Sequence, residues 1–187
     1  MPATPRARFN LSMIAVHWLT LVLIAGAYIT GQLKEAFEDT PTEALIKDWH
    51  ALLGLTVLGL VVLRIALRAV SRTPEIEPAP PRWQARIATL VHLALYGLMI
   101  LLPLTGWLTL SANGETVAWF GQTLPALVGP SRGLAHTLED VHEAIANAGY
   151  FLIGLHAAAA LFHHYVVRDN TLRLMVPGLG GTGRNYR

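Results

Sequence analysis

The sequence predicts an all-α integral membrane protein, a four-helix bundle with both termini cytoplasmic, in which residues 1–187 form a single domain. Of its residues, 53% are hydrophobic and 14% are charged, whereas a soluble domain carries about 25% charged residues. The mean hydropathy is +0.44. Since about 20 apolar residues cross a hydrocarbon core, four such stretches use up the length and leave no room for a separate globular domain.

Four membrane spans are predicted, over residues 11–33, 50–70, 86–110 and 142–167. The first span has no charged residue, and it is longer than the apolar region of a cleaved signal peptide, which is the competing interpretation. The second carries Arg64 and Arg68 one turn apart near its end, where both can reach toward phosphate or propionate groups. Pro103 in the third span is tolerable where neighbouring helices cover the freed carbonyl.

The connections between spans differ in length. Prolines 74, 78, 80 and 81 predict a short extended linker, because proline removes a donor and restrains its predecessor. The segment 111–140 carries an apolar patch at Val117, Trp119 and Phe120, and we expect a surface loop with a short interfacial helix whose tryptophan lies at headgroup level. No internal repeat or low-complexity tract is evident.

Positive charge predicts the orientation, since Lys and Arg concentrate on the cytoplasmic side. One side would carry Arg6, Arg8, Arg64, Arg68, Arg72, Arg82, Arg86, Arg168, Arg173, Arg184 and Arg187, and the other Lys34, Lys47 and Arg132. Both termini should therefore be cytoplasmic. The basic residues lie beside apolar spans, as membrane topology requires, so a nucleic-acid partner is not expected.

Histidine and oxygen are the ligands available to a metal, because the chain has no cysteine and hence no disulfide, thiolate site or iron–sulfur cluster. His142 and His156 are close to four helical turns apart, so they point to nearly the same face at depths that differ by about 21 Å. His50 opens the second span at the level of His142, and the two can hold one metal. His17 lies at a depth that His156 can reach, but His92 is equally deep and could replace either.

A flat macrocycle suits these histidines better than zinc does. Zinc would require three or four ligands at one level, and no acid lies in the core of a span. Two axial histidines instead fill both free positions of a haem iron, which favours electron transfer. The alternative for His50 and His142 is an ordinary interfacial histidine, whereas a merely structural role fits His17 and His156 less well because they lie deeper. His136 is expected to be an exposed loop residue.

The residues resemble the bacterial cytochrome b561 family. The resemblance is carried by Ala15-Val16-His17-Trp18, by Trp49-His50, by the run HEAIANAGYFLIGLHAAAALFHHY over residues 142–165, and by Arg168-Asp169-Asn170-Thr171-Leu172. It covers essentially the whole chain. It implies two haem b groups in a bundle of the bacterial inner membrane, with His17 and His156 as one axial pair and His50 and His142 as the other.

The same resemblance implies superoxide:ubiquinone oxidoreductase activity, with superoxide oxidised at the periplasmic side. The outer loops are net acidic and repel an anion, so a local cation is needed, for which Lys47 is the candidate. A salt bridge to Glu43 or a propionate contact is an equal alternative for Lys47. On the cytoplasmic side, quinone or propionate contacts are expected among five residues, which are His92, His163, His164, Arg64 and Arg68. At least one of His163 and His164 should face headgroups, and neither is expected to bind iron.

Two other functions remain open from the sequence. One is a membrane-anchor cytochrome b subunit that links a dehydrogenase or hydrogenase partner to quinone, with another one-electron donor in place of superoxide. The other is a histidine-lined metal or proton transporter. The short loops and brief tail after Val167 favour a self-contained protein over an anchor, and the oligomeric state is left open.

Overall fold

Four long helices dominate the structure, a computed structural model that describes residues 9–71 and 73–176. They are α1 (Leu11–Ala36), α2 (Glu43–Val70), α3 (Arg82–Ala112) and α4 (Arg132–Phe162), and α4 continues as a π-helix, η1 (His163–Val167). All four are long and apolar enough to cross a membrane. At most 22% of the residues in any of their most apolar windows are buried inside the protein, so most of the apolar surface requires lipid.

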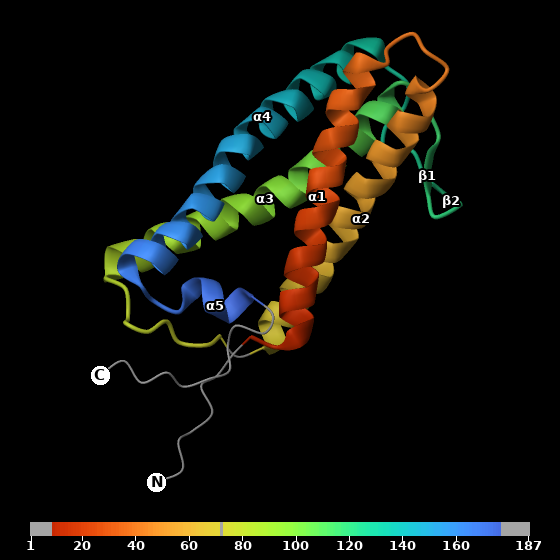
Figure 1. The fold of residues 1–187 in the computed structure, drawn as a ribbon. Coiled ribbons are helices and arrows are strands. Elements are labelled where there is room, and N and C mark those ends of the chain that lie inside the picture. The colour runs from red at the N-terminus through yellow and green to blue at the C-terminus, as the bar shows by residue number, and fades with distance from the viewer. Residues whose placement is uncertain (1–8, 72, 177–187) are drawn as a thin grey trace.

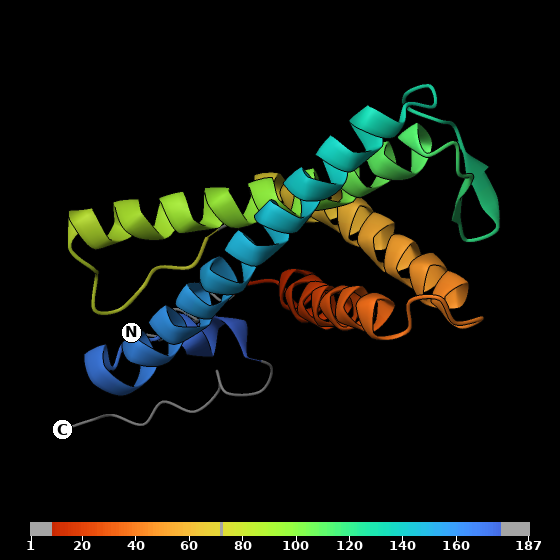
Figure 2. The same cartoon turned by 90° about the horizontal axis from the view of Figure 1, so that it is seen from above.

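The helices form two antiparallel pairs, α1 with α2 and α3 with α4, joined through α2 and α3 (Figure 1). A small apolar core of Val57, Val61 and Met99 lies where α2 meets α3. We call the end that holds residues 37–42 and 113–131 the hairpin end, and the opposite end the arginine end. Near the hairpin end, Lys34 of α1 reaches Glu139 of α4 at 3.3 Å, and Figures 1 and 2 show the two helices well apart at the arginine end.

The arginine end matches the positive side that the sequence predicts. Among the described residues it holds Arg64, Arg68, Arg82, Arg86, Arg168 and Arg173, whereas the hairpin end holds Lys34, Lys47 and Arg132. The predicted Arg6, Arg8, Arg72, Arg184 and Arg187 lie outside the described residues. The orientation of this asymmetry relative to the cytoplasm stays a prediction.

The segment 111–140 differs from its prediction. Instead of a loop with an interfacial helix, it forms a two-stranded antiparallel hairpin of β1 (Val117–Trp119) and β2 (Gln122–Leu124). The indole nitrogen of Trp119 donates to Thr56 Oγ1 at 3.2 Å, which places the ring beside the middle of α2, about 9 Å further along that helix than His50. Trp119 is therefore anchored on α2, and its position at headgroup level stays a prediction.

Helices α2 and α4 also begin earlier than hydropathy predicts. Helix α4 starts at Arg132 because the Ser131 hydroxyl caps it by accepting from the Leu134 amide. Its polar first turns carry an exposed His136–Asp140 pair, so His136 lies on a helix rather than in a loop. Hydropathy locates the bilayer, whereas caps and helix-compatible polar residues locate the helix ends.

The chain after α4 folds back across the arginine end. Arg168 adopts a left-handed conformation (φ 59°) that ends the π-helix, and α5 (Thr171–Met175) follows. The indole of Trp18 donates to the Met175 carbonyl at 2.7 Å, and Asn170 exchanges backbone and side-chain hydrogen bonds with Glu77. These contacts join α5 to α1 and to the proline-rich linker.

Candidate functional site

Two groups of histidines lie inside the bundle at separate levels. At the hairpin end the ring centroids of His50 (α2) and His142 (α4) are 6.0 Å apart. Toward the arginine end, the ring of His156 (α4) lies 6.4 Å from that of His17 (α1) and 5.3 Å from that of His92 (α3). The structure therefore brings together the histidines expected to pair, and it places His92 beside His156 as a third candidate.

The hairpin-end histidines are held through Nδ1. His50 Nδ1 lies 2.9 Å from the Ala27 carbonyl oxygen and 3.3 Å from Thr30 Oγ1. His142 Nδ1 lies 3.0 Å from Thr105 Oγ1, and the His142 ring also meets the Leu102 backbone. A carbonyl can only accept, so Nδ1 carries the proton in His50. The Thr105 hydroxyl donates to carbonyls of its own helix, so Nδ1 carries the proton in His142 as well. Nε2 is then free to bind a metal, which is the usual arrangement of a ligating histidine.

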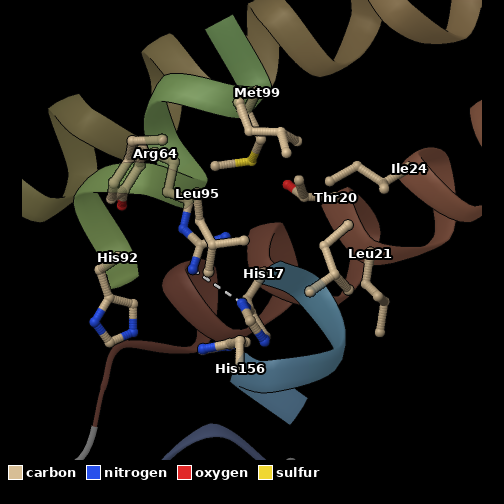
Figure 3. A pocket seen from close by; sticks show the side chains of 12 residues that line it. His17, Thr20, Leu21, Ile24, Arg64, His92, Leu95, Met99 and His156 are labelled. Atoms are coloured by element: carbon tan, nitrogen blue, oxygen red, sulfur yellow. Dashed lines mark hydrogen bonds between the residues drawn. The ribbon is translucent and has the colours of Figure 1, made fainter. Parts of the chain in front are cut away.

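The arginine-end histidines border a cavity of about 70 Å³ (Figure 3). Arg64 reaches into it from α2, with Nη2 2.9 Å from His17 Nδ1 and the guanidinium 5.6 Å from the centre of the Tyr96 ring. Its Nε is buried without a hydrogen-bond partner among the described residues. A buried guanidinium that is incompletely satisfied fits an anionic group of a ligand in this cavity.

The remaining predicted site residues lie farther from the two pairs. Arg68 stacks on Phe9 at the arginine end, with 5.8 Å from the guanidinium carbon to the ring centre. His163 Nδ1 lies 2.5 Å from Asp169 Oδ2, and His164 Nδ1 is buried without a partner in the described part of the chain. Lys47 Nζ forms a salt bridge with Glu43 at 2.9 Å, one of the alternatives open from the sequence.

The structure reveals an internal repeat that the sequence analysis missed. Thr30-Gly31 follows His17 on α1 by the same number of residues as Thr105-Gly106 follows His92 on α3. Each glycine packs on a histidine of the next helix, since a Cβ on Gly31 would lie 3.4 Å from His50 Cε1, and one on Gly106 would lie 3.3 Å from His142 Cε1. The equal spacing from His17 to Thr30-Gly31 and from His92 to Thr105-Gly106 could have revealed this repeat in the sequence.

The hairpin-end site fits a haem iron. Metal–imidazole bonds of about 2 Å, with about 1 Å more to each ring centre, place two axial rings about 6 Å apart, as in the 6.0 and 6.4 Å pairs. One turn along α2 from His50, a Cβ on Gly54 would meet no atom within 4 Å, which leaves room for a flat group. Among the described residues, no cluster of three or more histidines and acids suits a metal ion directly.

A membrane bundle with facing histidines at this spacing defines the class of helical membrane cytochromes. The family model of prokaryotic cytochrome b561 matches residues 8–178, and the chain belongs to that family. It is therefore a bacterial membrane protein that binds haem b and transfers electrons.

Several curated relatives are similar over nearly the whole chain. Cytochrome b561 homolog 1 of Escherichia coli is 36% identical over 171 residues, which are 91% of this chain and 97% of the relative. The probable superoxide oxidase CybB of Yersinia pestis is 36% identical over 170 residues, covering 91% and 96%. Cytochrome b562 of Cereibacter sphaeroides is 32% identical over 170 residues, covering 88% and 92%.

Proposed function

We propose that the single domain of residues 1–187 holds two haem b groups and carries electrons from superoxide at the hairpin end to ubiquinone at the arginine end. His50 and His142 would hold the iron of one haem, and His17 and His156 that of the other. The observation that carries this proposal is the presence of two histidine groups on α4 about 21 Å apart along the helix. Two haems bound at these levels would be two redox centres, between which electrons cross most of the hydrocarbon core of about 30 Å.

The choice between His17 and His92 as the partner of His156 rests on the distance between ring centres. The 6.4 Å between the rings of His17 and His156 leaves space for an iron with two ordinary bonds, whereas the 5.3 Å of His92 and His156 is short for that arrangement. His92 is then free to donate to a quinone carbonyl or a propionate. His163 and Arg68 are assigned the same kind of contact at the mouth of this end, and Arg64 a propionate.

Superoxide is proposed as the electron donor, and the support for it is a relative named a probable superoxide oxidase. Two superoxide anions each lose one electron and become O₂, while one ubiquinone takes up two electrons and two protons and becomes ubiquinol. The protein is accordingly an oxidoreductase. We assign it to the bacterial inner membrane with the arginine end cytoplasmic, because positive charge concentrates on that side. Lys47 at the hairpin end then attracts superoxide from the periplasm.

A pyridine haemochrome assay tests the haem assignment. We expect two haems per chain in the purified protein and about one in His50→Ala and in His156→Ala, because each variant removes one axial ligand. His136→Ala, an exposed histidine on the same helix as His156, should keep both. A protein without haem would overturn the proposal and favour a transporter instead.

Stopped-flow mixing of superoxide with the oxidised protein and a soluble ubiquinone analogue tests the reaction. We expect superoxide to disappear at a rate that depends on the protein, with one quinol formed for two superoxide anions consumed. If superoxide disappears no faster with the protein present, and in the absence of quinone leaves the haem oxidised, superoxide is rejected as the donor. That result would favour an anchor subunit that receives electrons from a dehydrogenase or hydrogenase.

A further inference from the structure

The groups behind the two sets of histidines have opposite electrical character. At the hairpin end, both rings meet acceptors, which are Ala27 O and Thr30 Oγ1 at His50 and Leu102 O and Thr105 Oγ1 at His142. In each case the carbonyl belongs to the residue three positions before the threonine. At the arginine end, the neighbour of His17 is the cationic guanidinium of Arg64.

The threonine hydroxyls act as acceptors toward the histidines. Thr30 Oγ1 lies 2.9 Å from the Gly26 carbonyl, and Thr105 Oγ1 lies 2.9 Å from the Leu101 carbonyl, so each hydroxyl proton points into its own helix. The oxygen lone pairs are left for Nδ1–H. Since acceptors on Nδ1–H make a ligating imidazole more basic, they favour ferric over ferrous iron and lower the reduction potential.

Arg64 acts in the other direction. No ion pair of the described residues includes it, and its Nε is buried without a partner there, so no carboxylate of these residues offsets its charge. A propionate held by Arg64, as proposed above, would have its own negative charge neutralised, and that negative charge would otherwise favour ferric iron. A guanidinium only donates, so in this structure His17 Nδ1 accepts from Arg64 Nη2. If His17 binds iron through Nε2, the proton moves to Nδ1, the two nitrogens separate, and Arg64 stays in the same cavity as a positive charge. Positive charge in a low-dielectric site disfavours ferric iron and raises the reduction potential.

We infer that these residues order the two haem potentials, with the haem between His50 and His142 the lower and the haem between His17 and His156 the higher. Electrons pass spontaneously from lower to higher potential, so the chain's own residues bias transfer from the hairpin end to the arginine end. Thr30 and Thr105 are positioning residues in this scheme. The inference rests on the two-haem arrangement of the proposed function and adds its direction.

The near-perpendicular rings give a second signature. The planes of His50 and His142 lie at 70° to each other. Both rings are held by a threonine, and beside each Cε1 lies a glycine, where a Cβ would come within 3.4 Å of the ring. Low-spin ferric haem with crossed imidazole planes has a strongly anisotropic electron paramagnetic resonance signal, and this signal changes when a ring rotates.

A redox titration followed by optical and paramagnetic resonance spectroscopy tests this ordering in the purified holoprotein. In Thr30→Val/Thr105→Val we expect the lower midpoint to rise and the signal of that haem to change, whereas Thr30→Ser/Thr105→Ser should restore both. In Arg64→Gln the upper midpoint should fall. Thr109→Val is the matched control, because Thr109 makes the same bond to its own helix, 2.9 Å to Thr105 O, without a histidine partner.

The outcomes separate this inference from the proposed function. His50→Ala and His17→Ala assign each midpoint to its haem, and a protein with fewer than two haems would defeat the proposed function itself. Two haems whose midpoints stay within error in the threonine and Arg64 variants would overturn the inference and leave the proposed function standing. A higher midpoint for the haem at His50 would overturn it as well.

Discussion

The hydroxyl of Tyr28 on α1 donates to the carbonyl of Ala146 on α4 at 2.8 Å. This bond joins two helices that otherwise diverge toward the arginine end (Figure 1). Tyr28 also packs against Tyr150, with ring centres 4.4 Å apart and the rings tilted by 47°, at a level between the two histidine groups. The contact thus joins α1 to α4 between the proposed haem sites.

Gly149→Ala is expected to destabilise this junction. Gly149 is buried, and a Cβ there would overlap the Tyr28 hydroxyl and lie 2.7 Å from Leu98 Cδ1. Overpacking of this kind costs about 1–3 kcal/mol, so the melting temperature of the solubilised holoprotein should fall by several degrees. Gly133→Ala on the same helix has open space and is the control. Equal melting temperatures for the two variants would refute the packing role of Gly149.

The buried Asp169 carboxylate is expected to hold the arginine end closed in a pH-dependent way. Burial acts to raise the pKa of Asp169, but hydrogen bonds from His163 and from Thr171 outweigh it and lower the pKa below its usual 3.8. A lowered carboxyl pKa stabilises the fold above the unfolded-state value, and this contribution is lost as the pH falls through the folded-state pKa. Asp169→Asn should therefore lower the melting temperature at pH 7 and lose that effect below about pH 4.

Trypsin gives a local readout of the same prediction. At pH 7, Asp169→Asn should speed cleavage after Arg168 and Arg173, because Asp169 ties η1 to the start of α5. Asp140→Asn is the matched control, since it breaks an exposed His–Asp pair that contributes little. Similar cleavage rates in the two variants would show that the buried pair does not hold α5.

The membrane helices and the pairing of the histidines could be predicted from the sequence. The hydrogen bonds that hold the histidine rings, and the contact of the hairpin with α2, could not. Charge-free apolar runs report the hydrocarbon core, and helical period places His142 and His156 on one face. Thr30 and Thr105 carry no such signal, because a threonine in a helix usually bonds a carbonyl of its own helix. The Trp119–Thr56 contact was hidden for a similar reason, since an aromatic residue in a membrane loop more often marks the interface.

Gly54 is expected to be required for haem occupancy rather than for folding. A Cβ on Gly54 meets nothing in this structure, yet it points along the face of α2 that carries His50 one turn earlier. Gly54→Ala should fold normally but lose haem at the hairpin end. Gly59→Ala is the control on the same helix, because its Cβ makes an ordinary 3.7 Å contact with Trp119. Full haem content in Gly54→Ala would mean that the macrocycle does not reach Gly54.

Lys47 and Glu43 are expected to change the superoxide reaction in opposite directions. Their 2.9 Å salt bridge neutralises the cation in an acidic surface, so Glu43→Gln frees its charge and should speed superoxide consumption. Lys47→Gln should slow it by about two- to five-fold at low salt. Both effects should shrink at high ionic strength, because salt screens exposed charges. Stopped-flow rates at two salt concentrations decide the matter, and rates that neither substitution alters would remove Lys47 from the path of superoxide.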